Sequence, residues 1–300
     1  MRIMDNNMTV VDDLSAERYA SLFNFVPSEE REITFWPRCF SALTSAELSQ
    51  FDIIIHLAAK TNAAASFENR EDMERVNVDQ TYHFIDKAAK AGVRLFVFPS
   101  STSVYGVARE IVTEDDPTCI NPQSPYAESK IKIENALLDS KMPCIIFRFG
   151  TIFGTSPGMR FHTAVNKFCY QACVGEPLTV WKQNYHQKRP YLGLADALRA
   201  MEYVARKFSL ADQPADIVNQ VYNVASGNHT VAEVIEFIKK YRDIEINLID
   251  TPLLNQYSYE VSCDKIANLG YVPICHIEDG IRQTVQQLSR IKRSRPDRIV

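Results

Sequence analysis

Residues 51–59, FDIIIHLAA, open the stretch of sequence that decides the fold. They form an apolar run of strand length, rich in β-branched side chains, which is typical of a buried strand. RVNVDQTYHFIDKAAKAG (75–92) follows with apolar residues at helical spacing and ends at Gly92, and RLFVFPSS (94–101) returns to a strand pattern. A strand, an amphipathic helix and a second strand in this order predict one unit of a parallel sheet.

The same alternation extends in both directions along the chain. MTVVDDLS (8–15) and PCIIFRFG (143–150) have strand character, and YAESKIKIENALLDS (126–140) has helical periodicity. These segments predict an α/β fold with a doubly wound parallel sheet. A ligand site is expected outside the carboxyl ends of its strands.

The pattern loosens after residue 150, where prolines and glycines separate short elements. We expect residues 1–150 to form the sheet domain and residues 151–300 to form mainly a smaller lobe that faces a substrate. VYNVASG (221–227) reads as a further strand that returns to the sheet, so the boundary is approximate.

Composition excludes several classes of function. A formal net charge of -4 over 300 residues gives no electrostatic reason to expect nucleic acid or an anionic membrane as partner. The seven cysteines lack paired spacing, and Cys169 and Cys173, one helical turn apart, have no third ligand nearby, so no metal site is expected. The apolar runs are far shorter than the roughly 20 residues of a membrane helix. These features predict a soluble, cytoplasmic protein.

Tyr126 and Lys130 lie four residues apart on a predicted helix, which places the ammonium beside the phenol on one face. A nearby cation lowers the pKa of a phenol, which lets it act as a general acid or base. Tyr203 and Lys207 repeat the spacing, so the spacing by itself does not choose between the two pairs.

A hydroxyl-rich segment, PSSTSVYG (99–106), follows directly after a predicted strand and precedes Tyr126. Hydroxyls at that strand end would face the ligand crevice of the sheet. The alternative is a turn whose side chains bond their own backbone.

Taken together, the motifs resemble the extended short-chain dehydrogenases, the NAD-dependent epimerase/dehydratase group. The resemblance rests on segments that occur in the family's order, namely HLAA (56–59), NV (77–78), SSTSVYG (100–106), YAESK (126–130), RFGTIFG (148–154) and RPYLGLADALRA (189–200). It implies a Rossmann-like domain that binds NAD over residues 1–150 and a nucleotide-sugar substrate.

The resemblance also implies roles for the active-site residues. Tyr126 matches the catalytic tyrosine, Lys130 the lysine that holds the nicotinamide ribose, and Ser101 the hydroxyl residue of the triad, with Thr102 as the alternative substrate-binding hydroxyl. Arg189 resembles the arginine that pairs with the substrate diphosphate, a role suited to a fork of donors. Without the resemblance, Arg189 would be read as a surface charge.

Cofactor contacts are implied in the same way. Asp12 matches the carboxylate that binds the adenosine ribose, and Leu57, Ala58 and Ala59 would line the cofactor groove. Asn77 would sit on a helix that supports the site. An exposed capping role for Asp12, and packing for the others, are the alternatives.

One family feature is missing. The family begins with a strand, a GxxGxxG turn and a helix that receive the pyrophosphate, whereas the first glycine here is Gly92. We therefore expect a sheet that is incomplete at its N-terminus, with a gap in the middle. Either the chain starts late, or something else, such as a partner chain, fills the gap.

The resemblance favours an NAD-dependent nucleotide-sugar epimerase that oxidises its substrate to a keto sugar and then reduces it. Dehydration is not expected, because Thr102 and Ser103 stand where dehydratases carry an Asp-Glu pair. The absent glycine turn leaves activity open, so the alternatives are a keto-sugar reductase and a non-catalytic or truncated homologue that acts as a binding or regulatory module. A homodimer and pairing with an intact homologue are both open.

Overall fold

The computed structural model describes residues 7–16, 33–63, 65–106, 108, 111–210, 216–250 and 258–289. The strands in this part are β1 (Met8–Asp12), β2 (Ile33–Pro37), β3 (Ile53–Ile55), β4 (Leu95–Ser101), β5 (Ile111–Val112), β6 (Cys144–Phe149), β7 (Thr151–Phe153), β8 (Leu178–Trp181), β9 (Lys188–Gly193), β10 (Gln220–Val224), β11 (Gly227–Thr230), β12 (Ile246–Ile249) and β13 (Glu260–Val261). The α-helices are α2 (Ser45–Leu48), α3 (Arg70–Glu74), α4 (Gln80–Lys90), α5 (Pro125–Asp139), α6 (Ala164–Val174), α7 (Leu194–Leu210), α8 (Val231–Lys239), α9 (Asp264–Asn268) and α10 (Ile277–Leu288).

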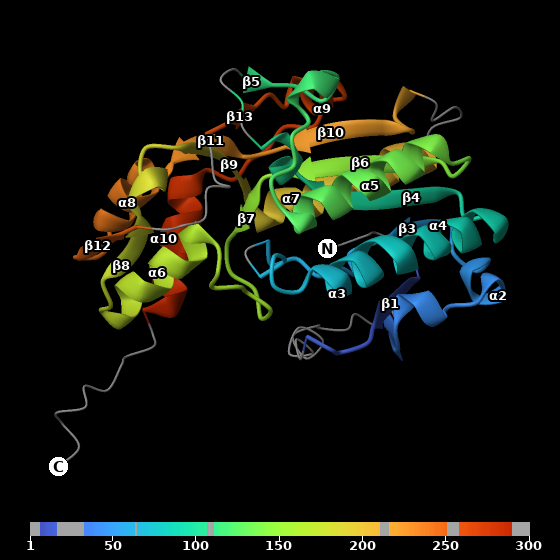
Figure 1. The fold of residues 1–300 in the computed structure, drawn as a ribbon, viewed down its shortest axis with the longest axis horizontal. Coiled ribbons are helices and arrows are strands. Elements are labelled where there is room, and N and C mark those ends of the chain that lie inside the picture. The colour runs from blue at the N-terminus through green and yellow to red at the C-terminus, as the bar shows by residue number, and fades with distance from the viewer. Residues whose placement is uncertain are drawn as a thin grey trace, which may run out of the picture.

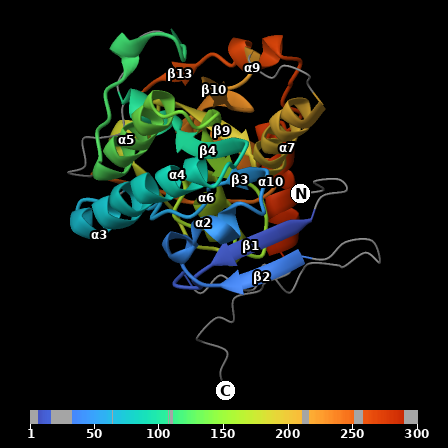
Figure 2. The same cartoon turned by 90° about the vertical axis from the view of Figure 1, so that its right-hand side faces the viewer.

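The central sheet is parallel and runs in the order β10-β6-β4-β3 (Figure 1). Helices α3, α4 and α5 lie on one face of it and α7 on the other, as Figure 2 shows. This confirms the predicted Rossmann-like α/β fold. It also confirms that the segment after residue 220 returns to the sheet, because β10 pairs with β6.

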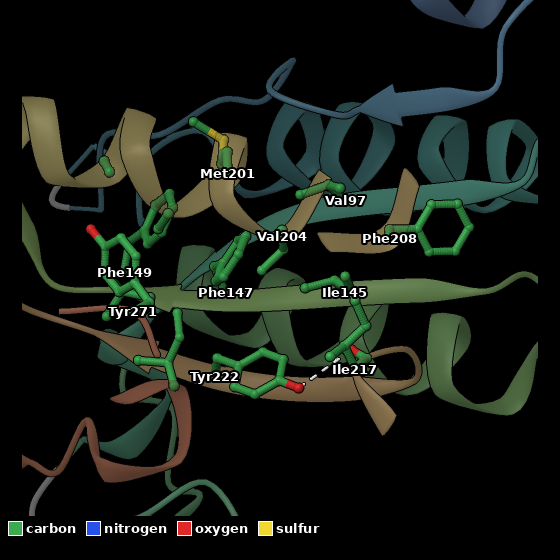
Figure 3. Packing of buried hydrophobic residues seen from close by; sticks show 14 of the residues in the cluster. Val97, Ile145, Phe147, Phe149, Met201, Val204, Phe208, Ile217, Tyr222 and Tyr271 are labelled. Carbon is green, nitrogen blue, oxygen red and sulfur yellow. Dashed lines mark hydrogen bonds between the residues drawn. The ribbon is translucent and has the colours of Figure 1, made fainter. Parts of the chain in front are cut away.

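Alternation along the strands builds a core on each face of the sheet. In β4, Leu95 and Val97 pack with residues of α7, and Phe96 and Phe98 pack with residues of α4 and α5. Figure 3 shows the α7 side, where β4, β6 and β10 contribute buried side chains to one cluster. A period of two with both faces buried is what a central parallel strand requires.

Strands β1 and β2 form a separate parallel pair, drawn in blue beyond β3 in Figure 2. Val11 of β1 and Trp36 of β2 nevertheless pack against the same cluster as Ile54 of β3. Among the described strands, none pairs with β3 on the side away from β4. The expected interruption of the sheet therefore falls between β1 and β3.

The predicted helix of residues 75–92 contains a π-helical turn, Arg75–Asp79, between α3 and α4. A π turn inserts an extra residue and rotates the face of the helix that follows. Phe84, Ile85 and Ala88 face the core. Tyr82, which is also one of the residues at helical spacing in the predicted helix, is exposed.

Several elements after residue 150 pack together beside the central sheet. Strands β11, β9 and β7 form one small sheet and β12 and β8 another. Helices α6, α8 and α10 pack around a cluster that includes Phe153, Leu178 and Tyr191. No helix among the described residues is both long enough and apolar enough to cross a membrane.

Asp196 in the first turn of α7 ties this lobe together. Its carboxylate is fully buried and accepts hydrogen bonds from the amides of Ile274 and Cys275 and from the Ser226 hydroxyl, at 2.8–2.9 Å. Arg199 donates a further bond at 2.9 Å. Burial opposes the charged form, but these bonds outweigh it and lower the pKa of Asp196.

We expect Asp196→Asn to lower the free energy of unfolding by about 3 kcal/mol, because it leaves buried donors facing an amide. Asp279→Asn, which breaks an exposed pair with Arg282 at the same three-residue spacing, should cost about 0.5 kcal/mol or less. Urea titrations measure both. The difference should be full at neutral pH and disappear as the pH falls through the lowered pKa of Asp196; equal losses in the two variants would contradict this account.

Candidate active site

The site lies where β4 ends and α5 begins. Ser124 caps α5 by accepting a bond from the Ala127 amide at 3.2 Å, and Pro125 occupies the first turn, where its missing N–H costs nothing. The buried hydroxyl of Ser66 accepts a bond from the Tyr126 amide at 3.4 Å. These contacts fix the first turn of the helix against the loop that follows β3.

The structure brings Ser101 and Tyr126 together. The Ser101 hydroxyl lies close enough to the Tyr126 phenol to lower its pKa. That hydroxyl also accepts bonds from the amide of Ser103 at 3.2 Å and from its hydroxyl at 2.9 Å. Ser101 therefore caps its own turn, as in the turn alternative, and also lies close to the phenol. The expected ligand crevice stays a prediction.

Lys130 lies one turn further along α5 and is buried. Its Nζ donates to the Pro99 carbonyl at 2.8 Å and lies 4.5 Å from the centroid of the Phe98 ring and 5.8 Å from that of Tyr126. Burial lowers the pKa of Lys130 to about 8, against the opposing effect of Glu134.

The expectation that Lys130 lowers the pKa of Tyr126 was wrong. Burial of the phenol dominates and raises the pKa of Tyr126. The Ser101 hydroxyl and the positive charge of Arg160 lower it, and Tyr259 raises it further. Arg160 comes from the loop before α6 and donates a hydrogen bond to the Thr61 hydroxyl, so a cation of the second lobe faces the phenol.

The second Tyr-Lys pair has a structural explanation. Tyr203 and Lys207 both donate to the carbonyl of Leu269, the residue that caps the C-terminus of α9. A phenol and an ammonium at the last carbonyls of a helix satisfy exposed acceptors there. Position in the fold thus separates the two pairs, which the spacing could not do.

Thr102 and Arg189 meet through a residue that the sequence analysis missed. The Thr102 hydroxyl bonds the hydroxyl of buried Tyr259 at 3.1 Å, and the Arg189 guanidinium lies 5.0 Å from the centroid of the Tyr259 ring. Nη2 of Arg189 is buried and has no hydrogen-bond partner among the described residues. Arg189 is therefore not a simple surface charge. Tyr259 lies in a short segment without motif spacing, so no local signal marked it.

The predicted cofactor residues occupy the ends of β1 and β3. Asp12 is exposed, and its Oδ1 accepts a bond from the Leu14 amide at 2.7 Å, as in the capping alternative. Leu57 is 63% exposed, while Ala58 and Ala59 are partly buried. Leu57 thus offers its surface at the interrupted edge of the sheet, and a cofactor contact by these four residues stays a prediction.

Asn77 acts as a clamp between the loop after β3 and α5. Its side chain accepts from the Lys60 amide at 2.8 Å, donates to the Lys60 carbonyl at 2.9 Å and reaches Ser129 at 3.3 Å. Asn77 therefore holds the loop after β3 against α5, and its cofactor role stays a prediction.

Two of the cavities in the described part of the chain are relevant to the location of the site. One of about 300 Å³ lies at the loop after β3 and is lined by Lys60, Thr61, Asn62 and neighbours on α3. The other, of about 420 Å³, lies between β11, α8 and α10 and contains none of the predicted site residues. No group of three or more His, Cys, Asp or Glu side chains in this part is placed to hold a metal ion.

The nicotinamide end of a dinucleotide fits the side chains present, since Ser101, Tyr126 and Lys130 converge at the carboxyl edge of the sheet. A carboxylate for the adenosine ribose is present in Asp12. A glycine turn that would receive the pyrophosphate is not among the described residues.

Comparison with known proteins agrees with this geometry. The model of the NAD dependent epimerase/dehydratase family matches residues 33–225. A dTDP-D-glucose 4,6-dehydratase of Mus musculus is 27% identical over 250 residues, which cover 80% of this chain and 68% of the relative. An uncharacterized UDP-glucose epimerase of Bacillus subtilis is 25% identical and covers 90% of this chain, with 84% of the relative covered.

Solved structures share the fold of this chain. TunA, an NAD dependent NDP-hexosamine 5,6-dehydratase of tunicamycin biosynthesis, superposes with a TM-score of 0.75 at 25% identity. The match covers 94% of this chain and 89% of TunA. The similar proteins thus include both epimerases and dehydratases.

The lowered pKa of Lys130 makes stability depend on pH. Between about pH 8 and pH 10.5 the unfolded chain keeps the lysine proton that the folded chain has lost, so unfolding becomes less favourable as pH rises. We expect the free energy of unfolding of the wild type to rise by about 3 kcal/mol more than that of Lys130→Met across this range. Denaturant titrations of both proteins at several pH values measure it, and parallel curves would refute the assignment.

Proposed function

The chain belongs to the NAD dependent epimerase/dehydratase family, and from this premise we propose that it is an NAD-dependent epimerase acting on a nucleotide sugar. The observation that carries the proposal is that the Ser101 hydroxyl lies close to the Tyr126 phenol, with the Lys130 ammonium 5.8 Å from the centroid of the phenol ring. A proton donor, a second hydroxyl and a cation at the carboxyl edge of a parallel sheet suit oxidation and reduction of a carbinol carbon.

Each side chain has a distinct part in this proposal. The NAD, when bound, would accept a hydride from the sugar carbon and return it to the opposite face. Ser101 hydrogen-bonds the sugar oxygen, and Tyr126 exchanges the proton of that oxygen. The raised pKa of Tyr126 keeps the resting phenol protonated, which suits proton delivery to the keto oxygen; the positive charge of Arg160 favours the phenolate that the oxidation step needs.

Arg189 supports a substrate that carries a diphosphate. Its buried Nη2 has no hydrogen-bond partner among the described residues. A buried guanidinium N–H without an acceptor is costly, and a phosphate oxygen is the acceptor that its geometry matches. The Tyr259 ring, whose centroid is 5.0 Å from the guanidinium carbon, supports the guanidinium in this position.

Epimerisation is favoured over dehydration by the residues after Ser101. Thr102 and Ser103 carry hydroxyls and no carboxylic acid, and the Thr102 hydroxyl is engaged by Tyr259. Loss of water from a sugar needs an acid to protonate the leaving hydroxyl. A keto-sugar reductase would use the same side chains, so the fate of the keto sugar distinguishes it from an epimerase.

A second candidate, a binding or regulatory module without catalysis, is favoured by one observation. The sheet is interrupted between β1 and β3, where the family binds the cofactor pyrophosphate. As a binding or regulatory module, the chain would pair with an intact homologue or with a second copy of itself. As an enzyme, we propose that it works in the cytoplasm.

We expect Tyr126→Phe to lower kcat/KM for interconversion of UDP- or dTDP-linked hexoses by about 100-fold or more, because the phenol supplies the proton. Tyr203→Phe is the matched control. It removes a phenol next to a lysine on another helix and should cost about 1 kcal/mol of stability without loss of activity. Product analysis by NMR measures turnover; full activity of Tyr126→Phe would end the proposed chemistry.

Titration of the chain with NAD separates the two candidates. An enzyme should bind with a Kd below about 1 mM, the range that corresponds to at least ~4 kcal/mol of binding free energy. Isothermal calorimetry gives the value directly. Saturable binding at this level discards the non-catalytic module, whereas no heat up to millimolar NAD discards the enzyme.

A further inference from the structure

A buried ion pair lies directly beneath the active site. Glu134 of α5 and Arg148 of β6 are 1% and 5% exposed. Arg148 Nη2 donates to Glu134 Oε2 at 2.7 Å, and its Nε lies 3.1 Å and 3.3 Å from the two carboxylate oxygens. This fork geometry fixes both side chains in the interior of the domain.

The pair is completed on each side by neutral groups. The Ser100 hydroxyl donates to Glu134. Arg148 Nη1 donates to the Tyr105 hydroxyl at 2.9 Å, and that hydroxyl donates to Asn223 of β10 at 2.7 Å. A buried pair whose remaining donors and acceptors are satisfied is fixed in one arrangement.

Three consecutive residues of β4 meet three consecutive turns of α5. The Pro99 carbonyl accepts from Lys130, and the Ser100 hydroxyl donates to Glu134. The Ser101 hydroxyl lies close to the Tyr126 phenol and lowers its pKa. On α5, Tyr126, Lys130 and Glu134 lie one turn apart on the same face. Glu134 is the one acid among them, and the other two are the proposed catalytic side chains.

The charged and titratable groups that act on Lys130 come from three elements. Glu134 lies on its own helix and opposes the loss of its proton, and Tyr126 lies on its other side at 5.8 Å from ring centroid to Nζ. His56, which follows β3, is buried among aromatic rings, and burial followed by the charge of Lys130 lowers its pKa to about 3, so it is neutral. Arg148 of β6 forms its ion pair with Glu134.

We propose that Glu134 is a positioning residue that acts through Lys130: its carboxylate, held by Arg148 and Ser100, supplies the negative charge that keeps the Lys130 side chain an ammonium beside Tyr126. The importance of this device for catalysis rests on the proposed function. The electrostatic link itself is a property of the folded chain and can be measured without turnover.

The experiment measures the ionisation of Lys130 in wild type and Glu134→Gln. In protein carrying ¹³C-lysine, the Cε signal of Lys130, assigned with Lys130→Met, reports its titration midpoint. Wild type should titrate near pH 8. Glu134→Gln should titrate about one pH unit lower or more, because a nearby opposite charge is lost and Arg148 is left unpaired.

Ser100→Ala is the matched control. It removes one hydrogen bond to Glu134 but leaves the carboxylate charged, so the midpoint of Lys130 should stay at the wild-type value. Because removing one partner of a buried pair is strongly destabilising, Glu134→Gln/Arg148→Met provides a second route. It removes both charges and should still titrate below wild type.

A midpoint unchanged from wild type in either folded Glu134 variant overturns the proposal and leaves the pair a structural one. If the proposed function holds, the basic limb of the pH–kcat/KM profile should move with the NMR midpoint in Glu134→Gln and stay fixed in Ser100→Ala. A chain that shows the NMR shift but no turnover keeps this inference and loses the proposed function, so the two failures are distinguishable.

Discussion

The packing of α5 on the carboxyl end of β4 is the contact on which the rest of the site depends. Ser100 and Ser101 are neighbours in the strand, and both act on residues of α5: the Ser100 hydroxyl donates to Glu134 inside the domain, and the Ser101 hydroxyl lies close to the Tyr126 phenol at the end of the strand. The buried carboxylate and the reactive phenol are therefore held by one strand and one helix. A shift of the helix by a single turn would separate both pairs.

Charge at this junction is balanced across the two halves of the chain. Lys130 and Arg148 are buried cations of the sheet domain with Glu134 as their shared anion. Arg160 and Arg189 enter from the second lobe, the first acting on Tyr126 and the second lying 5.0 Å from the centroid of the Tyr259 ring. An anionic ligand between the lobes would meet cations from the second lobe on one side and hydroxyls of the sheet domain on the other.

The interruption of the sheet divides the site into two parts. The residues around β4 are well supported by neighbouring elements, whereas those around β1 are not. On the β4 side, strands, helices and hydrogen bonds support every proposed catalytic side chain. On the β1 side, Asp12 caps its own turn, and Leu57 at the end of β3 presents an exposed apolar surface. Parallel strands normally have both edges paired, and among the described strands none pairs with the free edge of β3. Its backbone N–H and C=O groups there need other partners.

The sequence by itself determined the fold class, the strands around residues 53, 95 and 144, and the helix of Tyr126 and Lys130, because hydrophobic periodicity and ordered motifs are local properties. The Tyr-Lys spacing alone could not choose between the two pairs, although the ordered motifs pointed to Tyr126, and no sequence signal found Tyr259, Arg160 or the Glu134–Arg148 pair. Those depend on contacts between residues from 14 to more than 150 positions apart, as between Arg148 and Glu134 or Thr102 and Tyr259. Only the tertiary structure decided which cation faces the phenol, since burial and distance set a pKa, and neither is written in spacing.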